Sequence, residues 1–161
     1  MSTMNIGLNE KARKDVAQGL STILADTYTL NLKTLNFHWN LVSPRFSSLH
    51  LLFETQYNEK NPAIDELAER IRALGFFAPA SLSEFKKLTS IKDEEGVPET
   101  NDMITHLLEG HELIAKKCRE MCSHAQDLHD EVSADMLIGR MKFHEKTAWM
   151  LRSSVSDTNT K

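Results

Sequence analysis

The chain has 161 residues and a formal net charge of −4, with 40% hydrophobic and 26% charged residues. This length fits one domain, 1–161, with a sizeable core, and the charge provides no general attraction to nucleic acid. The N-terminal MSTMNIGLNEKARKD contains no apolar region and no run approaches the length of a membrane span, so we expect neither a secretory signal nor membrane insertion. We expect Cys118 and Cys122 to be reduced core residues of a cytoplasmic protein.

A first helix is predicted from about Glu10 to His38. Within it, apolar residues recur at three- and four-residue spacing, as they do on the buried face of an amphipathic helix. His38 lies at the C-terminal end of that face. Residues 1–9 and the polar segment 154–161 flank the predicted helices at the two ends of the chain, and we expect both to be flexible tails.

A second helix is predicted from Pro44 to about Leu74, antiparallel to the first because the turn between them is short. Ser43 is placed to cap its start and Gly75 to cap its end. Pro62 removes one backbone hydrogen bond and clashes one turn back, so we expect a kink or a break near residues 58–61.

The connection 76–100 is unusually long for a compact bundle, and it is long enough to carry the chain from one end of a bundle to the other. The sequence Ser81-Leu-Ser-Glu84 is a capping box, which predicts a short extra helix over Leu82–Leu88. We therefore expect this connection to have structure of its own.

A third helix is predicted from Asn101 to about Cys122, with His111 on its apolar face as a core or interface residue. After a polar turn over 123–128, a fourth helix is predicted from about His129 to Ser153. Four long helices with one long crossover, between the second and the third, form the all-α, four-helix arrangement of ferritin-like folds. Ferritin-like proteins that bind di-iron inside the bundle use Glu-x-x-His pairs, and the sequence contains none.

Two pairs of metal-ligating residue types follow each other along the second helix. His50 and Glu54 are i,i+4 neighbours, as are Asp65 and Glu69, and the two pairs share roughly one helix face. His38, at the end of the first helix, is by its position alone more often a core histidine than a ligand. Imidazoles with carboxylates and no cysteine suit iron, manganese or zinc. The other interpretation is an amphipathic helix whose solvated face carries ordinary surface acids.

The two pairs lie about 16 Å apart along the helix axis, at ~1.5 Å per residue, so one metal centre cannot span them. A second copy of the helix, antiparallel across a two-fold axis near residues 59 and 60, would close this gap. The His50–Glu54 pair of one chain would then face the Asp65–Glu69 pair of the other. Two identical sites would form at one isologous interface.

The same residues carry a family resemblance. The motif NFHWN, a histidine twelve residues after the first one, an acid four residues later and then DELAERIRALG resemble the Dps family of mini-ferritins, named as DNA-binding proteins from starved cells. The resemblance covers essentially the whole chain. It implies a hollow dodecamer that oxidises Fe(II) with hydrogen peroxide or oxygen, stores the ferric product and so protects the cell from oxidative damage.

By this resemblance, five residues match the ferroxidase ligands of the family, which hold iron between subunits: His38, His50, Glu54, Asp65 and Glu69. The Glu54 position is often aspartate in relatives, so the longer side chain is expected to shift the metal slightly. The resemblance also places Trp39 beside the iron centre, where it can act as a radical sink in addition to packing.

Two acids at the start of the fourth helix, Asp130 and Asp135, resemble those of the three-fold iron-entry pore of the family. A third acid often follows four residues later, where this chain has Gly139. The alternative is that both are simple helix-start acids, which stabilise the positive end of the helix dipole.

Two other functions remain open at this stage. One is a DNA-compacting stress protein with little ferroxidase activity, but the basic residues Lys11, Arg13 and Lys14 fall within the first helix rather than on a free arm. We therefore expect DNA binding to be weak or absent. The other is a helical assembly protein whose site holds zinc structurally.

Overall fold

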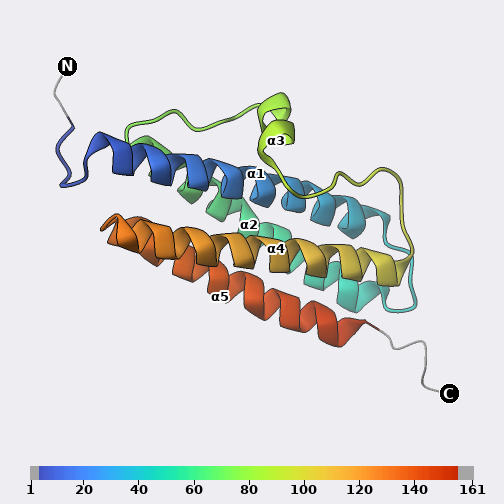
Figure 1. Cartoon of the computed structure of the whole chain (residues 1–161). Helices are drawn as coiled ribbons and strands as arrows, with labels where there is room; N and C mark the ends of the chain where they lie inside the picture. Colours follow the sequence, from blue (N-terminus) through green and yellow to red (C-terminus); the bar gives the residue numbers. More distant parts are fainter. Residues whose placement is uncertain (1–3, 156–161) are drawn as a thin grey trace.

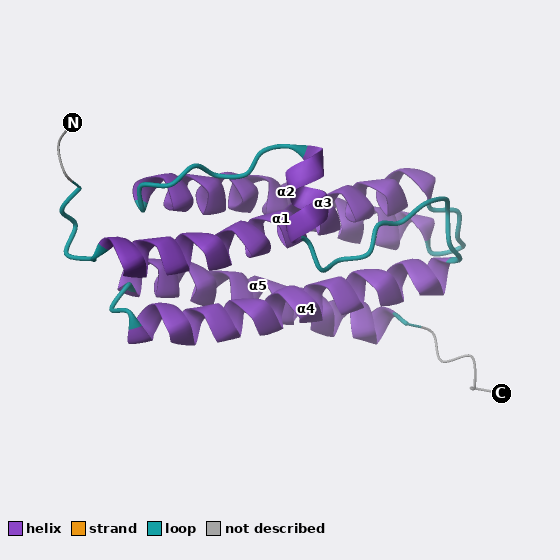
Figure 2. Cartoon of the chain, turned by 45° about the horizontal axis from the view of Figure 1, so that its top comes forward, coloured by secondary structure: helices purple, strands orange, loops and turns teal. Residues whose placement is uncertain are grey.

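The computed structural model describes residues 4–155, and all regular structure in that part is helical (Figure 1). The helices are α1 (Glu10–Asn40), α2 (Phe46–Ala73), α3 (Leu82–Leu88), α4 (Thr100–Asp127) and α5 (Glu131–Ser154). The four long helices lie side by side as an antiparallel bundle, and the short α3 lies outside it, against α1 (Figures 1 and 2). The predicted fold class and the extra helix are confirmed.

The connection between α2 and α4 runs the length of the bundle, past α1, so that α4 begins at the opposite end from where α2 stops (Figures 1 and 2). Its helix has the predicted capping box: Ser81 Oγ accepts from Glu84 N at 3.3 Å, and the Glu84 carboxylate accepts from Ala80 N at 3.3 Å. Phe85 is the buried residue of α3 and packs against Tyr28 of α1, with ring centroids 4.6 Å apart.

The buried side chain of Asp26 in α1 anchors the next part of the connection. Its Oδ1 accepts hydrogen bonds from Ser90 N at 2.6 Å and Thr89 Oγ1 at 2.9 Å, and its Oδ2 pairs with Lys117 Nζ of α4 at 2.6 Å. A buried carboxylate is stable only when paired and hydrogen-bonded, as this one is. One side chain thus joins α1, α4 and the crossover.

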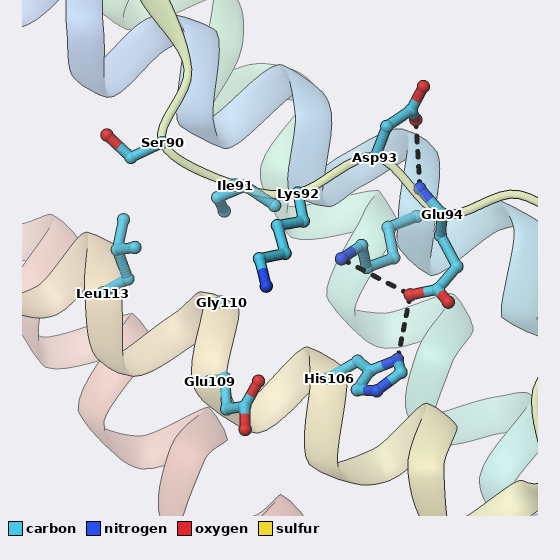
Figure 3. A pocket seen from close by; sticks show the side chains of 10 residues that line it. Ser90, Ile91, Lys92, Asp93, Glu94, His106, Glu109, Gly110 and Leu113 are labelled. Atoms are coloured by element: carbon cyan, nitrogen blue, oxygen red, sulfur yellow. Dashed lines mark hydrogen bonds and ion pairs between the residues drawn. The ribbon is translucent and has the colours of Figure 1, made fainter.

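A second anchor follows at Glu94. Its Oε2 lies 2.9 Å from His106 Nδ1 of α4 and 3.5 Å from Lys33 Nζ of α1 (Figure 3). These three residues border a pocket of about 350 Å³ between the crossover and α4. None of the five predicted metal ligands lines this pocket.

Helix α2 differs from its prediction in two respects. It begins at Phe46 rather than Pro44, because Ser43 to Arg45 form a turn in which Ser43 O accepts from Phe46 N at 2.9 Å. The prediction of a break near 58–61 is wrong, because α2 continues through Pro62. Pro62 and Asn58, the residue that would have accepted its missing N–H, are both exposed, so water can satisfy the freed carbonyl.

The turn between the last two helices lies later than predicted. Helix α4 continues to Asp127, and the chain reverses over Leu128 to Asp130, with His129 at a φ of 61°. The last turn of a helix that faces solvent can be as polar as a loop, and this is the case at 123–128, where Ser123 and His124 are exposed. Polarity alone therefore did not distinguish a turn from the solvent-facing end of a helix.

The hydrophobic core is built from the facing stripes of the four long helices. On α2 this buried face consists of Leu49, Phe53, Gln56, Lys60, Ala63, Leu67 and Ile71, at three- and four-residue spacing. Two of these residues are polar, and they lie at the middle of the bundle together with other buried polar side chains.

Among residues 4–155, no helix is long and apolar enough to cross a membrane. The predicted tails fall partly outside the described residues, namely at 1–3 and 156–161. Of the remainder, Asn9 is the N-cap of α1, where its side chain accepts from Ala12 N at 2.9 Å, and Ser154 is the last residue of α5.

Candidate metal centre

His38 and His50 form a stacked pair where the end of α1 meets the start of α2. Their ring centroids are 3.7 Å apart with an interplanar angle of 16°. His38 Nδ1 lies 2.9 Å from the backbone oxygen of His50, and His50 Nδ1 lies 3.0 Å from the backbone oxygen of His38. The short turn between the two helices makes this exchange possible, because it brings the end of one beside the start of the other.

The two backbone contacts determine which ring nitrogen can bind a metal. A carbonyl oxygen only accepts, so each ring donates from Nδ1, and in the neutral form of each ring Nε2 keeps a lone pair. Metal-binding histidines are oriented in this way by a hydrogen bond from the other ring nitrogen. His38 and His50 thus have the tautomer of paired metal ligands.

Two aromatic residues hold the pair in place. Phe46 stacks on His50 with centroids 4.8 Å apart, and Tyr57 meets His38 edge-on at 5.0 Å. Neither residue was predicted from the sequence. Phe46 lies one turn before His50 and Tyr57 two turns after it on the same helix, and this spacing could have indicated both contacts.

The three acids occupy the outward side of α2. Asp65 and Glu69 are exposed and Glu54 is partly buried, whereas Lys60, between them in sequence, is on the opposite, buried face. Because α2 is continuous, the separation of about 16 Å between the two ligand pairs applies. Within residues 4–155 of one chain, no group of three or more His, Cys, Asp or Glu side chains is arranged to hold a metal. The structure thus joins His38 to His50 but brings neither to Asp65 or Glu69.

Trp39, which follows His38, is 66% exposed. About a third of its surface is therefore covered by its own chain. Its side chain, like Asp65 and Glu69, is available to a second molecule.

The two acids of the predicted pore have different environments. Asp130 is 2% exposed and caps α5: its Oδ1 accepts from Ser133 N at 3.0 Å and from Arg70 Nη2 at 2.6 Å, and its Oδ2 accepts from Ser133 Oγ at 2.6 Å. Asp135 is exposed. Both oxygens of Asp130 thus have structural partners, and Asp135 is the acid available to a passing cation.

A second set of polar side chains, separate from His38 and His50, lies buried inside the bundle. Of its members only His111 was noted from the sequence. Arg140, His144, His111 and Gln56 are joined by hydrogen-bond contacts of 2.9–3.2 Å, and Lys60 Nζ donates to Thr34 Oγ1 at 3.1 Å. The pKa of Lys60 is lowered from 10.5 to about 7, chiefly by burial; Glu59 partly opposes this shift and Arg140 adds to it. These polar residues occupy the same helical positions as the apolar core residues, so helical periodicity did not distinguish them from the core.

The bundle with its long crossover defines a class, the ferritin-like proteins. A family model described as a ferritin-like domain matches residues 17–160. The chain is 39% identical over 157 residues to a low temperature-induced protein of Nostoc sp. (96% of this chain, 88% of that one). It is 34% identical over 140 residues to DNA protection during starvation protein 2 of Bacillus anthracis (87% and 96%).

Solved structures agree with the sequence relatives. Dps of Vibrio cholerae superposes with a TM-score of 0.91 at 28% identity, covering 97% of this chain and 98% of that one. Dps of Staphylococcus aureus gives a TM-score of 0.86 at 33% identity, covering 89% and 97%. The chain belongs to the Dps family of ferritin-like proteins.

Proposed function

We propose that this protein oxidises and stores iron, and that its oxidation sites lie between two copies of the chain. The observation that carries the proposal is the oriented pair His38 and His50, which leaves both Nε2 atoms for a metal but has no third ligand beside it among residues 4–155 of the same chain. Asp65 and Glu69 face outward on the same helix. A second copy related by a two-fold axis would bring them to the histidines, and its own histidines to Asp65 and Glu69 of the first.

The bundle interior supports a site at the interface. Proteins of this fold that hold di-iron inside the bundle use inward-pointing carboxylates from all four helices. Here the middle of the bundle contains the cationic side chain of Arg140, the amine of Lys60, which is a cation below its pKa of about 7, and the neutral amide of Gln56. Positive side chains repel a divalent cation, so the outward face of α2 is the better location. The Vibrio cholerae relative is described as a member of the ferritin-like diiron-carboxylate superfamily.

The chemistry follows from the ligand set. Imidazoles and carboxylates bind Fe(II) and stabilise Fe(III), which prefers the negatively charged oxygens. Two Fe(II) ions supply two electrons to one hydrogen peroxide, which takes up two protons and becomes two water molecules. No one-electron product of peroxide is released, so iron and peroxide are removed together. The ferric product would be stored inside a hollow shell of twelve chains, by the family resemblance, in the cytoplasm.

The proposal is tested by following Fe(II) oxidation by the purified assembly, with hydrogen peroxide and with oxygen as separate oxidants. The double variant His38→Ala/His50→Ala should lose the fast phase of oxidation, while His124→Ala, an exposed histidine of α4, should retain it. Equal rates in the double variant and the control would contradict the proposal. Iron-dependent consumption of peroxide separates it from a site that holds zinc structurally.

DNA compaction is the less favoured function. Lys11 and Lys14 lie in the first turns of α1, and Arg13 donates to the backbone oxygen of Leu74 at 2.7 Å, so none is on a free arm. Each chain carries a net charge of −4, and every added copy increases the negative charge that repels phosphate. A gel shift at low salt near neutral pH should therefore show weak or no binding.

A further inference from the structure

The buried polar residues at the middle of the bundle form a chain of contacts across three helices. Arg140 Nη2 of α5 lies 3.2 Å from His144 Nε2, and His144 Nδ1 lies 2.9 Å from His111 Nδ1 of α4. His111 Nε2 lies 3.2 Å from Gln56 Oε1 of α2. Both histidines are fully buried. The contacts therefore join α5, α4 and α2 directly, side chain to side chain.

Hydrogen-bonding chemistry gives this chain one direction. A guanidinium only donates, so His144 Nε2 accepts and its proton is on Nδ1. That proton is donated to His111 Nδ1, and His111 then donates from Nε2 to the carbonyl oxygen of Gln56. With two neutral rings, this is the arrangement that satisfies all three contacts. A further proton on either ring would place two donors face to face, and one contact would break.

The charged groups around the pair also oppose another proton. Lys60 of α2 and Arg140 of α5 are cations beside it, and Glu59, which pairs with Arg140, is the compensating anion. Burial lowers the pKa of His111 and His144 well below the ordinary value, and both cations lower it further.

The remaining groups on the neighbouring helices do not offset this charge. On α4, burial raises the pKa of the Cys118 thiol to about 12, so it is neutral. On α1, Asp26 is paired with Lys117, and Thr34 contributes an uncharged hydroxyl that accepts from Lys60. A protonated histidine here would thus be a third cation with one anion to balance it, at a position where both rings are fully buried.

We propose that His111 and His144 form an acid-sensitive latch that holds α2 against α4 and α5. Protonation of either ring breaks the contact chain and loosens the middle of α2. The contact chain reaches α2 at Gln56, and at its other end Arg140 pairs with Glu59 of α2. Gln56 lies on the reverse face of the helix that carries Glu54 and Asp65. The latch therefore determines how firmly the outward face of α2 is held, and it operates whether or not that face binds iron.

Amide hydrogen exchange of the assembled protein, corrected for the intrinsic pH dependence of exchange, tests the latch. In the wild type, protection of the middle of α2 should fall between pH 7 and 5. Protection can fall by at most about tenfold per pH unit for each proton that the histidines take up when the segment opens. His111→Gln and His144→Gln should flatten this profile whatever their absolute stability, while His124→Gln should retain the wild-type slope.

Two outcomes would overturn the latch. One is a wild-type profile that stays flat from pH 7 to pH 5 in α2, which needs no variant to fold. The other is a wild-type slope that persists in both His111→Gln and His144→Gln. Since neither readout involves iron, a failure here is distinguishable from a failure of the proposed oxidation activity.

Discussion

Lys60 is a fully buried lysine whose amino group has one hydrogen-bond partner, the hydroxyl of Thr34. Desolvation lowers its pKa to about 7, from 10.5 in the unfolded chain. As the pH falls from 10.5 to 7, the unfolded chain takes up this proton and the folded chain does not, so stability decreases across that window. Below pH 7 the folded protein contains an incompletely compensated charge.

Replacing this lysine should stabilise the bundle. Lys60→Met retains the apolar stem and removes the charge, and we expect the free energy of unfolding at pH 7 to rise by roughly 1–4 kcal/mol. The gain should shrink toward pH 10.5, where the wild-type amine is neutral in both states. Urea unfolding at pH 7 and pH 9.5 measures both effects, with the exposed Lys116→Met as control. A variant less stable than the wild type at pH 7 would contradict this account of Lys60.

At the scale of single residues, the family resemblance predicted that His38 and His50 share a site, and the sequence did not predict how the two rings contact each other. By its helix position alone, His38 resembles a core histidine. The exchange of contacts between each Nδ1 and the other residue's backbone oxygen depends on the exact packing of two helix ends, which spacing does not encode. The contact between His111 and His144 was not predicted either, because each residue by itself has the spacing of an ordinary core position.

At the scale of helices, α5 begins with a buried ion pair. Asp130 caps the helix and pairs with Arg70 of α2. Asp130→Ala removes the cap and leaves the Arg70 guanidinium without its partner, so we expect a loss of roughly 2–4 kcal/mol in the free energy of unfolding. A loss below about 0.5 kcal/mol, the usual size for a surface substitution, would show that the pair is not structural.

Asp135 gives the matched test of the iron-entry pore. It lies on the exposed side of α5, so Asp135→Asn should leave stability unchanged within about 0.5 kcal/mol. If Asp135 attracts Fe(II) at a three-fold pore, the same variant should slow iron uptake several-fold at low ionic strength, and added salt should reduce the difference. Stopped-flow uptake by wild type and variant measures this, and equal rates would remove Asp135 from the pathway.

The helices themselves were largely predictable, because apolar periodicity and capping boxes are local. The bounds of α3 were predicted correctly from its capping box. The errors fell where local signals were ambiguous: the turn before Phe46, the polar end of α4, and Pro62, whose cost is small on a solvent-exposed face. These are differences of context that a single sequence does not show.

At the scale of the whole molecule, one chain contains half of each proposed site. The continuity of α2 keeps its two predicted ligand pairs about 16 Å apart, so in the proposed site the completing residues come from a second chain. Sequence reasoning reached this geometry because it depends only on helical rise and rotation. The number of chains in the assembly does not follow from that geometry, and for it the proposal relies on the family.

Mixing two inactive chains tests the shared site most directly. In a dimer of a His50→Ala chain with an Asp65→Ala chain, one interface site lacks both residues and the other retains an intact His50 and an intact Asp65. Each variant by itself has every site damaged. Co-refolded protein should therefore oxidise Fe(II) faster than either variant, approaching half the wild-type rate in true heterodimers. Absence of any recovery, with mixed dimers demonstrated by native mass spectrometry, would contradict a site built from two chains.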